Sequence, residues 1–174
     1  GTSPLYTMRE AFGETGRLPL TPEMLRDGRS GDLFEASHQL SDVVDAALAQ
    51  SGQAKIDILA ECTGGVIARH YIQSLGGDQY INRMVTFISP QHGVDKAPLA
   101  AAIAGWPALY DLSPGSEFLE TVNSAPLPEN VPITSIYTCT DQDIRPVEAS
   151  IIPGATNIEV CDGFDNDCNG IVDD

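Results

Sequence analysis

The sequence predicts an α/β fold with a mostly parallel sheet and helices on both faces. Short apolar runs at 56–60, 83–89, 133–138 and 157–160 are each long enough for a strand, and the second is rich in Val, Thr, Phe and Ile. Helical periodicity precedes and follows the first run, so a helix, a strand and a helix succeed one another along the chain. This alternation is typical of a parallel sheet, whose strands are joined by crossover helices.

The first predicted helix spans residues 36–50, where apolar side chains recur at helical spacing. We expect Ser37 or Ser41 to cap its start and Gly52 to end it. Proline and glycine punctuate the stretch before it, which predicts only short helical turns at 6–12 and 22–27.

A tight turn, Glu61-Cys62-Thr63-Gly64-Gly65, joins the first strand to the next helix. Strand, turn and helix in this order predict a nucleophile elbow, which exposes one side chain above the sheet. Cys62 occupies the nucleophile position of the G-x-S-x-G pattern, and Ala60 replaces its first glycine. Gly65 is expected to let the new helix pack close to the sheet.

This elbow resembles that of the α/β-hydrolase lipases, in particular secreted bacterial triacylglycerol lipases and esterases with a GHSxGG-hydrophobic-x-x-R-Y pattern. Gly64-Gly65, Ala68-Arg69 and Tyr71 match the pattern, whereas Ala60-Glu61-Cys62 replace Gly-His-Ser. Later segments resemble the same family in the right order, at 90–94, 108–116, 139–146 and 150–160. The resemblance implies a three-layer α/β-hydrolase core, in which the N-terminal part of the usual sheet is missing or degenerate.

The same resemblance implies hydrolysis of a carboxylic ester, which needs a nucleophile, a base, an orienting acid and oxyanion donors. It assigns the nucleophile to Cys62, the acid to Asp141 and an oxyanion donor to the backbone N–H of Thr63. The loop that carries the triad histidine in the family is replaced here by residues 161–174, which contain no histidine. His92 follows a strand and is the first candidate for the base, although the resemblance places it in a structural loop.

The acidic segment 161–174 predicts a metal site. Its D-x-D-x-N-G pattern places oxygen ligands at alternate positions, as at the start of an EF-hand-type calcium loop. The segment also resembles the C-D-G-x-D-N-D-C-D/N-G-x-V-D metal-binding repeat of secreted bacterial surface proteins. An acidic disordered tail is the alternative. The predicted calcium ligands are Asp165, Asp167, Asn169, the backbone carbonyl of Ile171, and Asp173.

The chain has four cysteines. Cys161 and Cys168 lie close together in the acidic loop, which indicates a local disulfide formed in an oxidising compartment. Cys139 is most simply a residue of a core strand, and a disulfide between Cys62 and Cys139 is an alternative.

The net charge is −16 over 174 residues, with a sequence pI of about 4.2. This acidity disfavours nucleic acid and anionic membrane surfaces as partners. No apolar stretch is long enough to span a bilayer, and the chain does not open with the charged-then-apolar pattern of a signal peptide. We expect a secreted or cell-surface bacterial protein, outside the cytoplasm, whose oligomeric state the sequence does not define.

Residues 1–160 are expected to form the hydrolase-like domain and residues 161–174 the disulfide-closed calcium loop. The first functional hypothesis is a lipase or esterase relative that acts on a lipid or small-molecule ester through Cys62. The second is a non-catalytic, calcium-binding extracellular protein that retains the hydrolase fold. The third is a truncated fragment of a lipase.

Overall fold

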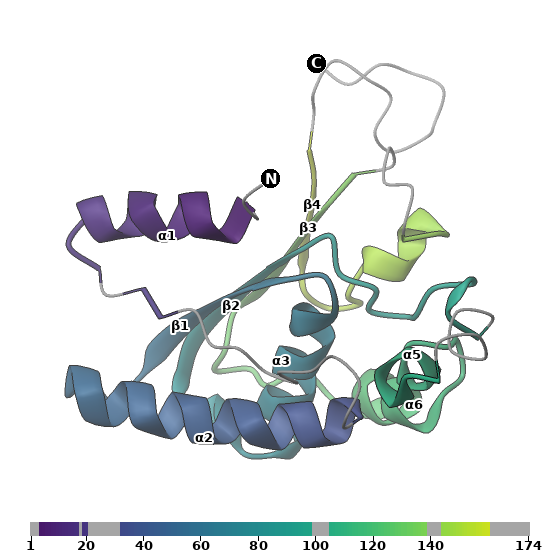
Figure 1. Cartoon of the computed structure of the whole chain (residues 1–174), viewed down its shortest axis with the longest axis horizontal. Helices are drawn as coiled ribbons and strands as arrows, with labels where there is room; N and C mark the ends of the chain where they lie inside the picture. The colour runs from purple at the N-terminus through teal and green to yellow at the C-terminus, as the bar shows by residue number, and fades with distance from the viewer. Residues whose placement is uncertain (1–3, 18, 21–31, 99–104, 139–143, 161–174) are drawn as a thin grey trace.

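The computed structural model describes residues 4–17, 19–20, 32–98, 105–138 and 144–160 (Figure 1). Its strands are β1 (Ile56–Glu61), β2 (Ile81–Phe87), β3 (Ile133–Tyr137) and β4 (Thr156–Glu159). Its α-helices are α1 (Pro4–Glu14), α2 (Leu33–Ser51), α3 (Thr63–Ser74), α5 (Pro107–Asp111) and α6 (Glu117–Ser124). Two short 3-10 helices, η1 (Gly77–Gln79) and η2 (Val147–Ser150), lie in the connections.

The four strands form one sheet in the order β1-β2-β3-β4, and every neighbouring pair is parallel. This confirms the predicted parallel α/β fold, and within the described ranges no strand precedes β1. All four carboxyl ends therefore meet at one edge of the sheet, the edge at which α/β proteins place their sites. The predicted end of β2 at Ser89 is two residues too late, because Ile88 has φ 49° and leaves the β conformation.

Helix α2 starts earlier than its periodicity predicted. Asp32 is the N-cap, and its carboxylate accepts the backbone N–H of the third helical residue at 2.8 Å. Ser37 and Ser41 were therefore wrong as caps. Ser37 lies a turn inside the helix, where its buried hydroxyl donates to the carbonyl of Leu33 at 2.8 Å. Gly52 ends the helix in the left-handed conformation, as predicted, with φ 67°.

The core lies between the sheet and the helices α2, α3 and α6. Figure 1 shows α2 and α3 on one side of the strands and α1 on the other. Helix α3 is buried along almost its whole length, which fixes the direction in which its first turn points. The largest fully buried side chains of this core include Leu33, Val44, Tyr71, Ile72, Met84 and Phe118.

Candidate active site

Cys62 is the single residue between the end of β1 and the start of α3. Its backbone has φ 51° and ψ −132°, and its side chain is an exposed free thiol. The N–H of Cys62 donates to the carbonyl of Phe87 on β2 at 3.2 Å, and its carbonyl accepts the N–H of Gly65 at 3.0 Å. A positive φ is unfavourable for a residue with a Cβ, so these contacts hold a strained turn that places the thiol above the sheet.

Gly65 determines how closely α3 approaches β2. A Cβ at this position would lie 2.9 Å from the Cβ of Ser89 and still closer to the hydroxyl oxygens of Ser89 and Thr86. These two buried hydroxyls are hydrogen-bonded to each other. The expectation that Gly65 permits close packing is confirmed, and the contact lies one turn from the thiol.

The first turn of α3 directs backbone N–H groups towards the region of Cys62, because the first N–H groups of a helix have no partner within it. Thr63 is the first helical residue, and its hydroxyl oxygen lies 3.9 Å from the sulfur of Cys62. A helix N-terminus carries partial positive charge and favours an anion close to it. The elbow can therefore stabilise an oxyanion formed on a bound carbonyl group.

His92 lies in the loop that follows β2, and β2 is the strand next to the elbow strand β1. Its backbone N–H donates to the carbonyl of Ala149 at 3.0 Å, and its ring nitrogen Nε2 lies 3.0 Å from the carbonyl oxygen of Ile151. A carbonyl can only accept, so Nε2 carries the proton and Nδ1 is left as the basic nitrogen. Within the described residues, no hydrogen bond joins His92 to Cys62.

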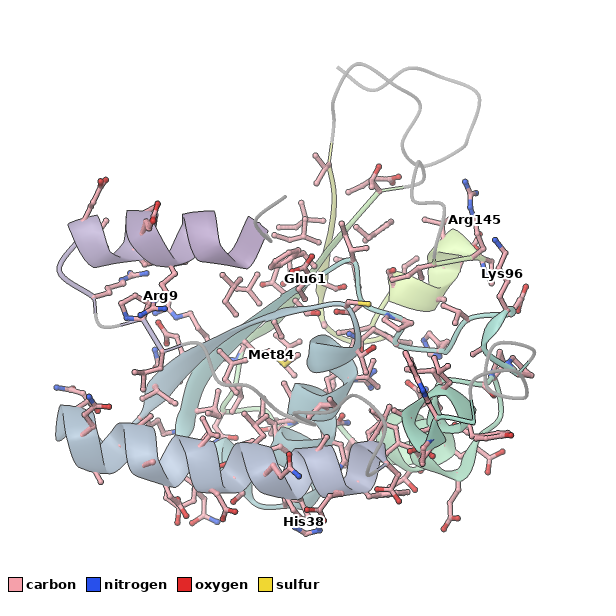
Figure 2. The ribbon with its side chains drawn as sticks, in the orientation of Figure 1. Arg9, His38, Glu61, Met84, Lys96 and Arg145 are labelled. Carbon is pink, nitrogen blue, oxygen red and sulfur yellow. The ribbon has the colours of Figure 1, made fainter. Side chains whose placement is uncertain are left out.

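The other two histidines lie away from the elbow. His70 is 4% exposed and is packed between the rings of Phe34, at 5.2 Å, and Phe118, at 5.1 Å. Burial, and secondarily the charge of His38, lower the pKa of His70, so this ring is a neutral core residue. Figure 2 shows that His38 points from α2 away from the sheet.

A buried arginine ties the elbow helix to the loop that carries His92. Arg69 of α3 is 3% exposed, and its Nη1 donates to Gln91 Oε1 at 3.0 Å and to Asn123 Oδ1 at 3.2 Å. Its Nη2 donates to the carbonyl of Val122 at 3.4 Å, near the carboxyl end of α6. Asn123 Nδ2 in turn donates to the carbonyl of Gln91 at 2.9 Å. Because these partners are neutral oxygens and the guanidinium is buried, desolvation lowers the pKa of Arg69 to about 10.

Arg69 was visible in the sequence only as the arginine of the elbow pattern, and its partners were not predicted. A second contact that was not predicted lies at the start of α2. Asp111 Oδ2 accepts the N–H of Leu33 at 2.7 Å, and burial raises the pKa of this carboxyl group.

Several predicted site residues lie outside the described part of the chain. These are Asp141, Cys139, the disulfide pair Cys161 and Cys168, and the ligands Asp165, Asp167, Asn169, Ile171 and Asp173. Elsewhere, among the residues that the structure describes, no group of three or more His, Cys, Asp or Glu side chains could hold a metal ion. The described helices include none that is long and apolar enough to cross a membrane.

A nucleophile-type elbow on a parallel sheet places the protein among the α/β-hydrolases. A family model described as palmitoyl protein thioesterase matches residues 18–138, more than half of the 174 residues, so the chain belongs to this family. A second family model, described as "Putative metal-binding motif", matches residues 139–174 and includes the acidic C-terminal segment. A comparison with curated proteins returned no match.

Solved structures confirm the fold. The mature form of the Bacillus licheniformis lipase BlEst2 has a TM-score of 0.63 and 17% identity, over 82% of this chain and 69% of that one. Aspergillus fumigatus lipase B has a TM-score of 0.62 and 20% identity, over 74% of this chain and 34% of that one. Legionella pneumophila phospholipase PlaB has a TM-score of 0.59 and 15% identity, over 84% of this chain and 37% of that one. The chain thus spans about a third of the last two enzymes.

Proposed function

We propose that this chain is a hydrolase of carboxylic esters, thioesters included, that uses the thiol of Cys62 as its nucleophile. The observation that carries the proposal is the exposed free thiol of Cys62 at the strained tip of the elbow, directly before the first turn of α3. The family name and the lipase structures support an acyl group as the part of the substrate that is recognised.

In the proposed reaction, the Cys62 thiolate attacks the carbonyl carbon and forms a C–S bond, while the carbonyl oxygen becomes an oxyanion. The N–H of Thr63 would donate to that oxyanion, which exists only in the transition state and intermediate. Collapse of the intermediate breaks the bond to the leaving oxygen or sulfur, which takes up a proton. Water then cleaves the acyl-cysteine and regenerates the thiol.

A base and an orienting acid complete this proposal. In the sequence, His92 follows β2 and Asp141 follows β3. In the sheet, β2 and β3 are the next two strands after the elbow strand β1. His92 would act through Nδ1, because Nε2 contacts the carbonyl of Ile151. Asp141 would take the acid role that the lipase resemblance implies.

The test is hydrolysis of a short-chain p-nitrophenyl ester by the native chain and by the variants Cys62→Ala, Cys62→Ser and His92→Gln. We expect Cys62→Ala to abolish hydrolysis, and His92→Gln to lower kcat/KM by about a hundredfold or more if His92 is the base. Hydrolysis that persists in Cys62→Ala would refute the thiol nucleophile. An inactive native chain would favour the alternative of a non-catalytic, metal-binding member of the family.

We also propose that segment 161–174 binds calcium. Its carboxylate, amide and carbonyl oxygens are hard ligands that suit calcium. Copper prefers imidazole and sulfur donors, but the segment has no histidine and its two sulfurs would be joined in the proposed disulfide. Asp165, Asp167, Asn169, Ile171 and Asp173 would hold the ion. A disulfide between Cys161 and Cys168 would close the loop, and it would form in an oxidising compartment outside the cytoplasm.

Millimolar calcium is expected to raise the melting temperature of the chain, because an ion that binds only the folded loop stabilises it. Magnesium should raise it less, since it demands near-octahedral geometry and keeps its waters. The matched control is the double variant Asp165→Asn/Asp167→Asn, which should lose the calcium response. An unchanged melting temperature with calcium, or a shift with copper alone, would contradict the proposal.

A further inference from the structure

Two residues other than glycine have a positive φ within the described residues, one at the elbow and the other directly after the neighbouring strand β2. Cys62 has φ 51° and Ile88 has φ 49°. For a β-branched residue this conformation is a marked outlier, because its Cβ substituents crowd the backbone. Glycine or asparagine would adopt it at lower cost.

The sheet register brings these two residues together. Glu61 on β1 pairs with Phe87 on β2, so Cys62 and Ile88 are each the next residue beyond that pair. The N–H of Cys62 donates to the carbonyl of Phe87 at 3.2 Å, and the N–H of Ile88 donates to that of Ile136 on β3 at 3.0 Å. Cys62 and Ile88 therefore directly follow two neighbouring strands, at the same carboxyl edge of the sheet.

The packing of the residues that follow explains why the backbone turns at position 88, but it does not explain why the residue at this position is an isoleucine. The residues that follow turn inward, where Ser89 and Gln91 are 0% exposed and are held by Thr86 and Arg69. The positive φ at position 88 begins this turn. Ile88 itself is 37% exposed, so part of its apolar surface stays open to solvent and to a bound ligand.

We propose that Ile88 is a specificity-determining residue, whose side chain forms an apolar contact for the acyl chain of a substrate at Cys62. This inference rests on the proposed function, because it assigns the apolar part of the substrate to one side of the nucleophile. Strained residues persist at sites where a particular side chain is needed in a particular place. An exposed isoleucine beside a thiol favours substrates with a long alkyl chain over acetyl-sized ones.

The experiment measures how fast N-methylmaleimide and N-octylmaleimide alkylate Cys62, in the native chain and in Ile88→Asn. Asparagine tolerates a positive φ, so this variant should fold, and Ile88→Gly serves as a second variant with the same backbone preference. We expect the octyl reagent to react about tenfold faster than the methyl reagent in the native chain, and the ratio to fall close to one in both variants.

Ile158→Asn is the matched control, because Ile158 is also an exposed isoleucine, at 46%, but lies on β4, three strands from β1. Its variant should keep the native ratio. An unchanged ratio in Ile88→Asn and Ile88→Gly, or an equal fall in Ile158→Asn, would overturn the inference.

The same variants separate this inference from the proposed function when p-nitrophenyl octanoate and acetate replace the maleimides. Chain-length-dependent alkylation without Cys62-dependent hydrolysis of either ester would refute the hydrolase and leave the Ile88 contact standing. Cys62-dependent hydrolysis with the same chain-length preference in the native chain and in Ile88→Asn would refute the contact alone.

Discussion

Replacing Arg69 with methionine is expected to lower the free energy of unfolding by about 3 kcal/mol, since buried hydrogen bonds to a charged group are each worth about 1.5–3 kcal/mol. The substitution keeps much of the side-chain volume and removes every donor. It leaves the buried oxygens of Gln91 and Val122, and the side-chain oxygen of Asn123, without the guanidinium that they contact. Urea unfolding of the native chain and the variant measures the difference.

Arg69→Lys is the control for charge. Lysine keeps the positive charge but lacks the planar fork that reaches Gln91 and Asn123 together. We expect its stability to lie between that of the native chain and that of Arg69→Met. A loss below about 1 kcal/mol in Arg69→Met would show that the buried network is not a main support of the fold.

Replacing Gly65 with alanine is expected to destabilise the chain by about 3 kcal/mol, at the upper end of the usual cost of overpacking a core. The added methyl group would lie 2.9 Å from the Cβ of Ser89, a separation that requires α3 or the loop after β2 to move. The melting temperature and the urea midpoint should both fall.

Gly64→Ala provides the matched control for this change, one residue away in the same helical turn. The atom nearest to its new methyl group would be the Cβ of Ala60 at 3.9 Å, an ordinary contact. Alanine is the better helix former, so this variant should be as stable as the native chain or up to about 1 kcal/mol more stable. Equal destabilisation by the two substitutions would contradict the packing account of Gly65.

The parallel sheet and the elbow could be predicted because their signals are local. Apolar strand runs, helical periodicity and the Gly64-Gly65 pair all lie within a few residues of the features that they specify. The start of α2 was misplaced because serines near the apolar stripe satisfy the same capping preference as Asp32. Helix α5 (Pro107–Asp111) was not predicted as a helix, because five residues are too short to show a period.

The environment of the site depends on residues far apart in the chain. Arg69 meets Gln91 across 22 positions and Asn123 across 54, and His92 meets Ile151 across 59. No local pattern encodes such contacts. The positive φ of Ile88 could not be predicted for another reason. Isoleucine is a strong strand former, so the predicted strand continued through this residue.

The most direct test of the account is the intact mass of the protein, recorded seconds after mixing with p-nitrophenyl octanoate and quenching in acid. A nucleophilic Cys62 predicts a mass increase of one octanoyl group in the native chain, which is absent in Cys62→Ala. If the native chain gains no acyl group while N-methylmaleimide still labels Cys62, the thiol is accessible but does not attack the ester, and the central claim fails.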